Sequence, residues 1–448
     1  MSSTASSALG KASSVRYRPV TEFNVAKIPQ WELMEEEERE AVEVVSKVLP
    51  FRTNRYVVDE LIDWSNIPGD PMYQLTFPQR GMLEEEDYRL VSRLLRGEAP
   101  RAEIDQAVEE IRWKLNPHPA GQLTHNVPTL EDEQVEGLQH KYRETVLYFP
   151  GQGQTCHAYC TYCFRWAQFV GMPEIKFESR QVDDLVRYLR AHPEVSDVLV
   201  TGGDPLIMKT RLLRRYLEPL LDSGLESLRN IRLGTKAPAY WPQRFVTDKD
   251  ADDLLRLFEE VVESGRHLSV MGHYSHPAEL STPISRQAIR RIRSTGAEIR
   301  MQAPIIRHVN DWPQAWAEMW TEGVRLGMVP YYMFVERDTG AKAYFELPLA
   351  RAFAVFQEAY SSVSGLARSV RGPSMSAFPG KVRILGIERV QGRKVFVLDL
   401  LQGRDPSWVR RPFFAEFDPR ASWFDQLEPA FGESFFFEEE LQEVAVPA

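Results

Sequence analysis

Between residues 142 and 360, short apolar runs alternate with longer segments that carry apolar residues at helical spacing. The apolar runs predict strands over residues 145–149, 197–201, 230–233, 267–271, 297–301 and 329–335. The segments between them predict helices over residues 180–191, 210–221, 248–264, 285–294, 312–326 and 348–360. Strands that are apolar on both faces and alternate with helices are typical of a parallel sheet covered by helices. Six such units, with strands roughly 30–40 residues apart after the first crossover, predict a partial (β/α)6 barrel that is open on one side.

The regions on either side of these six units have other patterns. Before them, apolar periodicity predicts helices over residues 35–48, 84–96 and 102–115. After them, two strand-like runs separated by Gln391 and Gly392 predict a hairpin over residues 381–400, and the acidic, Phe-rich segment 431–441 predicts a packed tail. We therefore expect a disordered tail (1–20), a helical N-terminal region (21–135) that ends in a Pro-rich linker (117–128), the barrel (136–362) and a small α+β C-terminal region (363–448).

The composition narrows the class of protein. Of the 448 residues, 43% are hydrophobic and 26% are charged, which is ordinary for a globular protein with a core. The net charge of −10 argues against nucleic-acid binding, because that function needs a basic surface. The sequence contains no run of about 18 apolar residues, so no membrane span is expected. Residues 1–15 are Ser-rich, lack acidic residues and lack the apolar core of a signal peptide. They fit a disordered tail, with a transit peptide as the alternative.

All three cysteines of the chain, Cys156, Cys160 and Cys163, fall within one short segment. This pattern excludes a disulfide framework and predicts a metal site in a reducing compartment, the cytoplasm. The spacing Cys-x3-Cys-x2-Cys follows the first predicted barrel strand directly, where α/β barrels carry their chemistry. Three thiolates on one loop can hold three irons of a [4Fe-4S] cluster and leave the fourth iron open. The alternatives are a structural zinc site with His157 as fourth ligand and three cysteines that serve only as core residues.

A second motif, Thr201-Gly202-Gly203-Asp204-Pro205, ends the second predicted strand. Two glycines let a backbone approach a ligand closely, and Asp204 is an acceptor for an ammonium group. Together with the cysteine spacing and the aromatic Tyr162, this motif resembles the radical S-adenosylmethionine (SAM) superfamily. The resemblance implies a radical SAM barrel in which the open iron chelates SAM and the Gly202-Gly203-Asp204 motif binds the SAM amino group. Reductive cleavage of SAM then yields a 5′-deoxyadenosyl radical, which abstracts a hydrogen atom from the substrate.

Further segments resemble one family of that superfamily, the lysine 2,3-aminomutases. In family order they are HKYRETVL (140–147), CFRW (163–166), DVLVTGGDPL (197–206), IRLGTKAPAYWPQRF (231–245), GHYSHPAEL (272–280), MQAPIIRHVND (301–311) and VPYYMF (329–334). By this resemblance Arg165 binds the carboxylate of an amino-acid substrate, a task that suits the planar fork of a guanidinium. His273, His276 and Gln302 match positions that surround SAM, and Asp311 matches a carboxylate near the distal amine of the substrate. Without the resemblance, Arg165 reads as half of a surface ion pair, the histidines as structural residues, and Asp311 as a helix cap.

The same family uses pyridoxal 5′-phosphate (PLP), which requires a lysine for the resting Schiff base and donors for the phosphate. Lys381 stands about where the family places that lysine, and Lys141 stands where relatives have a basic residue near the phosphate. The chain departs from the family in lacking the glycine run before the lysine. It also lacks any acidic residue between Val370 and Lys381, where lysine-specific enzymes carry a second amine-binding carboxylate. Lys381 is equally interpretable as the exposed first residue of a hairpin strand, so the sequence leaves the use of PLP open.

Three hypotheses for the function follow from this sequence. The first is a PLP- and SAM-dependent amino-acid 2,3-aminomutase, and the second is a PLP-independent radical SAM enzyme that acts on another carboxylate-bearing substrate. The third is a zinc-stabilised binding protein without enzymatic activity. The first two imply an amino-acid-like small-molecule substrate and a reductant of the flavodoxin or ferredoxin type. A homo-oligomer stays open, but the C-terminal zinc-binding cysteines of the family are absent, so an oligomer held in that way is not expected.

Overall fold

The fold is dominated by one eleven-stranded sheet whose strands lie in the order in which they occur along the chain. The computed structural model describes residues 17–116, 126–171, 177–179, 181–222 and 224–444. All neighbours from β6 to β12 are parallel, and the pairs at the two ends of the sheet are antiparallel. The strands are β5 (Leu138–Tyr142), β6 (Thr145–Tyr148), β7 (Asp197–Val200), β8 (Asn230–Thr235), β9 (His267–His273), β10 (Glu298–Ile305), β11 (Val329–Val335), β12 (Arg371–Ser376), β13 (Gly380–Val390), β14 (Arg393–Gly403) and β15 (Phe413–Glu416). The predicted α/β fold with a mainly parallel sheet is confirmed, while closure into a partial barrel stays a prediction.

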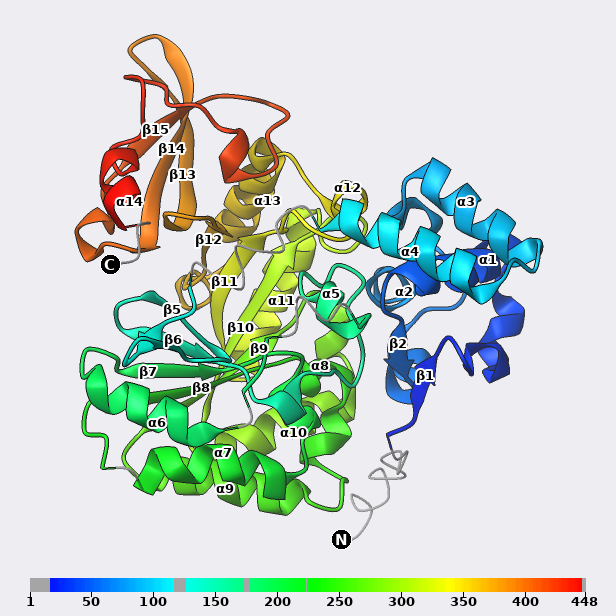
Figure 1. Ribbon diagram of the computed structural model, residues 1–448, viewed down its shortest axis with the longest axis horizontal. Coiled ribbons are helices and arrows are strands. Elements are labelled where there is room, and N and C mark those ends of the chain that lie inside the picture. The colour runs from blue at the N-terminus through cyan, green and yellow to red at the C-terminus, as the bar shows by residue number, and fades with distance from the viewer. Residues whose placement is uncertain (1–16, 117–125, 172–176, 180, 223, 445–448) are drawn as a thin grey trace, which may run out of the picture.

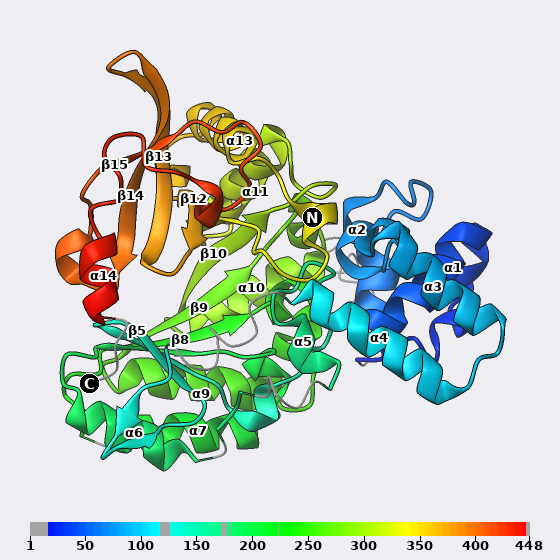
Figure 2. The same cartoon turned by 45° about the horizontal axis from the view of Figure 1, so that its top comes forward.

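Helices connect the parallel strands and cover the sheet (Figure 2). They are α6 (Val182–Ala191), α7 (Thr210–Asp222), α9 (Ala251–Glu263), α10 (Pro283–Ser294), α11 (Pro313–Arg325) and α13 (Leu349–Ser362), and each agrees with a predicted helix within a few residues. Helix α9 illustrates how the sequence pattern becomes a packing face. Leu254, Leu257, Phe258 and Val261 recur at helical spacing and are all fully buried, whereas the residues between them face solvent or are only partly covered, apart from Leu255.

The N-terminal helices pack beside the parallel part of the sheet (blue to cyan in Figure 1). Helices α1 (Glu36–Val48), α3 (Glu85–Arg96) and α4 (Arg101–Leu115) confirm the three predicted ones. Strands β1 (Pro19–Thr21) and β2 (Arg52–Asn54) form an antiparallel pair that is too short to leave a periodic signal. Buried residues of this region and of the sheet belong to one hydrophobic core. The predicted tail and linker fall mostly on residues 1–16 and 117–125, outside the described residues, and the domain boundaries stay predictions.

The C-terminal strands extend the main sheet. Strand β12 pairs in parallel with β11, and β13 and β14 form the predicted hairpin around Gln391 and Gly392. A second hydrophobic cluster, which includes Trp408, Phe413 and Phe437, packs beneath these strands. The Phe-rich end of the chain therefore contributes buried rings, as expected of a packed tail.

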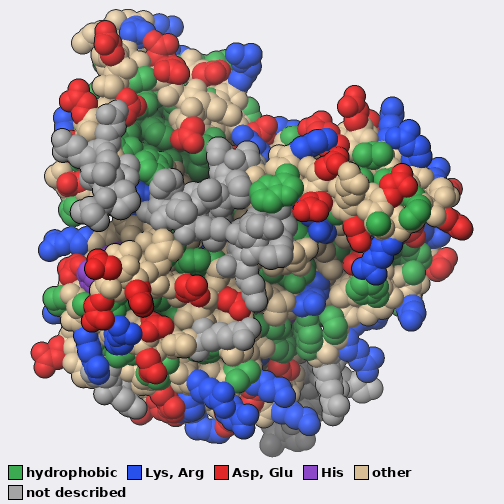
Figure 3. All heavy atoms as spheres, in the orientation of Figure 1, with side chains coloured by type: hydrophobic (Ala, Val, Ile, Leu, Met, Phe, Trp, Pro, Cys, Tyr) green, Lys and Arg blue, Asp and Glu red, His purple; other side chains and the backbone are tan. Residues whose placement is uncertain are grey.

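Smaller elements complete the described structure. They are α2 (Pro71–Thr76), β3 (Thr129–Leu130), β4 (Glu133–Gln134), α5 (Trp166–Phe169), α8 (Ala237–Tyr240), α12 (Lys342–Phe345) and α14 (Glu438–Val444). None of the helices in the described ranges has the length and apolar character needed to cross a membrane. On the face drawn in Figure 3, acidic and basic side chains are interspersed.

Candidate active site

The three cysteines lie on the loop between β6 and α5 and are partly buried. Burial raises the pKa of every one of these thiols, that of Cys163 to about 12, and neighbouring thiols raise it further for Cys156 and Cys163. A metal cation that binds such thiols takes the place of their protons and compensates for the lost solvation, as the irons of a cluster do. Within the described ranges, no three His, Cys, Asp or Glu side chains are arranged to share a single metal ion. A [4Fe-4S] cluster takes one thiolate per iron and makes no such demand.

The N-terminal region holds the backbone of this cysteine loop. Arg52 of β2 donates from Nη1 to the carbonyl of Cys156 at 3.0 Å, and its own carbonyl accepts from the amide of Tyr159 at 2.8 Å. The amide of Thr161 donates to the carbonyl of Leu75, the last residue but one of α2, at 3.0 Å. These contacts have no signal in the sequence, because hydrogen bonds between segments about 100 residues apart leave no trace in local periodicity. The N-terminal region is therefore a structural part of the cysteine site.

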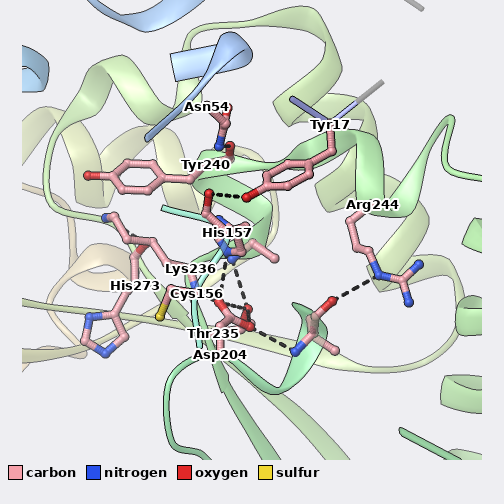
Figure 4. A network of polar contacts seen from close by, with 12 residues as sticks. Tyr17, Asn54, Cys156, His157, Asp204, Thr235, Lys236, Tyr240, Arg244 and His273 are labelled. Carbon is pink, nitrogen blue, oxygen red and sulfur yellow. Dashed lines mark hydrogen bonds and ion pairs between the residues drawn. The ribbon is translucent and has the colours of Figure 1, made fainter. Parts of the chain in front are cut away.

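Asp204 is the centre of a buried network that joins the cysteine loop to the loops after β7 and β8 (Figure 4). Its Oδ2 is 3.0 Å from Nε2 of His157 and accepts from the amide of Lys236 at 2.9 Å. Its Oδ1 accepts from the Thr235 hydroxyl at 2.7 Å and from the amide of Leu206 at 2.9 Å. The carboxylate thus has donors from this chain on both oxygens. Its predicted role as an acceptor for the SAM amino group stays a prediction.

His157 is held from a second side by the N-terminal segment, because the Tyr17 hydroxyl donates to its carbonyl at 2.8 Å. Its side chain is fully buried beside Tyr240 and Trp241. The Nε2 atom of this ring contacts Asp204, whereas the zinc alternative requires the ring to bind a metal ion.

Gly202 and Gly203 allow the loop after β7 to pack against the start of the cysteine loop. A Cβ on Gly203 would lie 2.4 Å from the carbonyl oxygen of Thr155, and one on Gly202 would lie 2.1 Å from Nε2 of Gln154. Gly202 also has a φ of +142°, a backbone conformation that residues with a Cβ rarely adopt. The close approach that the glycines make in this structure is to the cysteine loop itself, and their predicted contact with SAM stays a prediction.

Asp204→Asn is expected to destabilise the folded chain by about 3 kcal/mol, because it places an NH2 group among donors in a buried site. Burial alone would raise the pKa of Asp204, but its hydrogen bonds with His157, Thr235 and Lys236 bring it below its ordinary value. The stabilisation is therefore present at neutral pH and is lost as the pH falls through this lowered pKa. Urea unfolding followed by tryptophan fluorescence measures the effect. Asp184→Asn, on the solvent-facing side of α6, is the control. Equal, small losses of the free energy of unfolding in both variants would contradict the prediction.

A buried ion pair between Lys236 and Glu279 lies beside the cysteine loop. The Nζ of Lys236 is 2.6 Å from Oε1 of Glu279, and their side chains are 8% and 0% exposed. The same Nζ is 3.2 Å from Oγ of Ser275, which the Tyr162 hydroxyl approaches to 3.1 Å. The charge of Lys236 opposes the rise in the pKa of Cys160 that burial causes. Lys236 was not among the predicted site residues, although a lysine directly after a strand of a parallel sheet is a signal that could have identified it.

His273 and Gln302 meet at the ends of neighbouring strands. His273 is the last residue of β9, and its Nε2 lies 2.9 Å from the side-chain amide nitrogen of Gln302 in β10. Burial lowers the pKa of His273 to about 4, so the ring is neutral at pH 7 and accepts a hydrogen bond from Gln302. His276 caps a short 3-10 turn by accepting from the amide of Ala278 at 3.2 Å, and burial also lowers its pKa to about 4. The structure brings His273 and Gln302 together, and the SAM contacts of all three residues stay predictions.

Asp311 does not cap α11. This helix begins at Pro313 with Trp312 as its N-cap residue, and no side chain caps it. The carbonyl of Asp311 accepts from Nη2 of Arg351 at 3.0 Å. The capping alternative is therefore wrong, because the chain enters α11 one residue later than that alternative requires. The predicted contact of Asp311 with a substrate amine stays a prediction.

Arg165 lies next to the cysteine loop and has no acidic partner among the described residues. Its guanidinium stacks over the ring of Phe149, 4.1 Å from the centroid, and donates to Oε1 of Gln168 at 3.3 Å. Burial lowers its pKa to about 10, and the nearby thiol of Cys163 partly opposes this shift. Among the described residues no carboxylate forms an ion pair with Arg165, so the surface-ion-pair alternative finds no partner there. An incoming carboxylate would satisfy this guanidinium.

Lys381 lies against an aromatic ring of the main sheet. It is the second residue of β13, opposite Ser376 of β12, and its Nζ is 4.1 Å from the centroid of the Tyr332 ring. Burial lowers its pKa to about 8, and Arg232 and Arg371 add repulsion. The alternative of an exposed first strand residue is therefore wrong. A lysine whose pKa is close to neutrality is suited to forming a Schiff base.

Lys141 in β5 reaches the same part of the molecule. Its Nζ donates to the carbonyl of Ala377, in the turn that precedes Lys381. Burial lowers the pKa of Lys141 well below its ordinary value, and Arg404, Arg337 and Lys381 lower it further. Cations that repel one another inside a protein are suited to an anion such as a phosphate. These residues therefore fit PLP: Lys381 for its aldehyde, and Lys141 with Arg404 for its phosphate.

Known proteins were compared with the chain as a whole. No family model matches it. The chain is 31% identical over 391 residues to a protein of Aquifex aeolicus named putative L-lysine 2,3-aminomutase, and the match covers 87% of this chain and 91% of that protein. The chain belongs to the lysine 2,3-aminomutase family. L-lysine 2,3-aminomutases of Bacillus subtilis (27% identity; 53% of this chain and 47% of that protein) and Escherichia coli (28%; 53% and 67%) match a shorter stretch. Membership of the lysine 2,3-aminomutase family implies a [4Fe-4S] cluster and SAM, and the Cys156, Cys160 and Cys163 loop fits the cluster.

Proposed function

We propose that this protein is a radical SAM aminomutase that moves an amino group between adjacent carbons of an amino acid with the help of PLP. The observation that carries this proposal is a continuous group of interacting cations between Lys381 and the cysteine loop. The Nζ of Lys141 donates to the carbonyl of Ala377, in the turn before Lys381, and Arg337 is near enough to Lys141 to lower its pKa. The guanidinium groups of Arg337 and Arg165 lie 5.3 and 5.7 Å from the centroid of the same Phe164 ring, which directly follows Cys163. A lysine suited to PLP and a loop suited to a cluster thus belong to one site.

Apart from Arg337, the charged side chains of this group and the three cysteines each have a distinct task in the proposed reaction. Arg165 binds the α-carboxylate of the substrate and so directs the adjacent carbons toward the cysteine loop. Lys381 holds PLP when no substrate is present, and Lys141 and Arg404 bind its phosphate. The cluster and SAM supply hydrogen-atom abstraction, and PLP supplies a carrier for the amino group. Cys156, Cys160 and Cys163 ligate the cluster, and the Asp204 network holds their loop in place.

The test is a chemical trap for the lysine. The protein is reconstituted anaerobically with iron, sulfide and PLP, reduced with borohydride, digested and analysed by peptide mass spectrometry. We expect a pyridoxyl group on Lys381, and we expect deuterium to pass from a labelled amino acid into 5′-deoxyadenosine. SAM cleavage without a specific lysine adduct would reject the proposal in favour of a PLP-independent radical SAM enzyme. A reconstituted protein without iron would reject both and favour the zinc-stabilised binding protein.

A further inference from the structure

Arg337, just beyond the end of β11, is a cation that the proposed function leaves without a task. Its guanidinium carbon lies 5.3 Å from the ring centroid of Phe164 and 5.9 Å from that of Trp423. The guanidinium of Arg165 lies 5.7 Å from the same Phe164 ring. The two arginines therefore flank one aromatic side chain of the cysteine loop.

The guanidinium of Arg337 is shielded and incompletely paired. Its Nε is inaccessible to solvent and has no hydrogen-bond partner within the part of the chain that the structure describes. Burial lowers the pKa of Arg337, which shows that its charge is poorly solvated. A buried donor without an acceptor destabilises the folded protein, so an anion that accepts a hydrogen bond from it binds more tightly.

The charges around Arg337 do not balance. The cations that act on one another here are Arg165, Arg337, Lys141 and Arg404. The acids that face Arg337 are Glu336, Asp338 and Asp425. Burial raises the pKa of Glu336 well above its ordinary value and lowers the pKa of Lys141 well below its own, so burial weakens one charge of each sign and the cations still outnumber the carboxylates. An amino acid with a cationic side chain would add another positive charge to this site.

The proposed function accounts for three of these cations and leaves one. The α-carboxylate of the substrate uses Arg165, and the PLP phosphate uses Lys141 and Arg404. We propose that the substrate is an amino acid whose side chain ends in a carboxylate, and that Arg337 binds this second carboxylate. The rings of Phe164 and Trp423, which face the same guanidinium, then cover the methylene groups between the two carboxylates. This inference rests on the proposed function for the identity of the site.

The experiment compares two amino acids of the same shape that differ in charge. Binding of radiolabelled L-glutamate to the reconstituted holoenzyme is measured by equilibrium dialysis without a reductant, so that no turnover occurs. Unlabelled L-glutamine, L-aspartate and L-lysine compete in parallel. We expect L-glutamate to bind at least about tenfold more tightly than L-glutamine and L-lysine, because a charge-assisted hydrogen bond contributes about 1.5–3 kcal/mol.

Variants then assign the preference to Arg337. Arg337→Gln is expected to weaken L-glutamate binding by about 10- to 100-fold while leaving L-glutamine within about threefold, and Arg337→Lys is expected to retain part of the preference. Arg389→Gln, at an exposed arginine of the β13–β14 hairpin, is the control for loss of charge. Equal weakening of both amino acids would overturn the inference, because Arg337 would then bind a group that they share.

The wild-type protein alone can also overturn the inference, so the test does not depend on the folding of a variant. Tighter binding of L-glutamine or L-lysine than of L-glutamate would do so. These outcomes are separate from failure of the proposed function, which is judged by the adduct on Lys381 and by deuterium transfer. A glutamate preference without a lysine adduct would leave the second carboxylate site in place and remove the amino migration.

Discussion

Lys381→Ala is expected to abolish amino-group migration, with a loss of more than about 10³-fold in turnover and no pyridoxyl adduct on the chain. The reason is that Lys381 is the lysine proposed to hold PLP: its Nζ lies 4.1 Å from the centroid of the Tyr332 ring, and burial lowers its pKa to about 8. The measurement is product formation by chiral chromatography after incubation with SAM, reductant, PLP and amino acid. The same lysine predicts a pH dependence: PLP attaches faster as the pH rises towards 8, because only the uncharged amine attacks the aldehyde.

Lys394→Ala is the matched control for this prediction. Lys394 also lies over an aromatic ring, 3.6 Å from the centroid of Phe417, but it belongs to β14 and has no contact with the proposed site among the described interactions. Its removal is expected to leave turnover within about twofold. Full turnover by Lys381→Ala in PLP-depleted protein would show that the amino group moves without a lysine-bound carrier, and the assignment of Lys381 would be wrong.

Cys160→Ala is expected to reduce bound iron from about four per chain to less than one and to eliminate SAM cleavage. Two thiolates hold only two irons of the cluster, and the methyl group of an alanine at position 160 cannot ligate the third. Iron and acid-labile sulfide assays, together with detection of 5′-deoxyadenosine after addition of reductant, measure the result.

The control for this variant is the fold of the metal-free protein. The backbone of the cysteine loop accepts a hydrogen bond from Arg52 and donates one to the carbonyl of Leu75, and neither involves the thiol, so the circular dichroism spectra of the metal-free variant and wild type should agree. A variant that keeps four irons and cleaves SAM would contradict the ligand assignment. A variant with a changed spectrum would show that Cys160 has a packing role in addition.

The parts of the structure that the sequence predicted are those with local, repeated signals. Leu254, Leu257 and Phe258 predict a helix because their spacing places all three side chains on one face of α9, and this face is buried. The cysteine loop was found in the same way, from spacing within eight residues. Strand β12 was missed because Pro373 within a short run of small residues is typical of a loop. Gly372 nevertheless packs in the sheet, where a Cβ would lie 2.4 Å from the carbonyl of Met333.

The parts of the site that the sequence did not predict depend on pairs of residues far apart in the chain. Lys236 and Glu279 form their ion pair across 43 residue positions, and the contact between Arg52 and Cys156 spans 104. Arg337 likewise contacts Phe164, which belongs to the cysteine loop and is far away in the sequence. A charged residue near the end of a strand is visible in the sequence, but its partner is not. The geometry of the fold was therefore needed to separate Lys236, which forms a buried ion pair, from Arg337, whose Nε has no acceptor among the described residues.

The hydrogen bonds between the N-terminal region and the cysteine loop have a consequence for cluster assembly. Arg52 and Leu75 leave the ribosome well before Cys156, so the N-terminal residues that bind the loop backbone are already available when the cysteines emerge. Iron that arrives earlier meets thiols on an unrestrained segment, whereas iron that arrives later meets a loop with a fixed backbone. Chains that lose the first hundred residues to proteolysis should therefore emerge from cluster assembly iron-poor and oxygen-sensitive, even though every ligand is present.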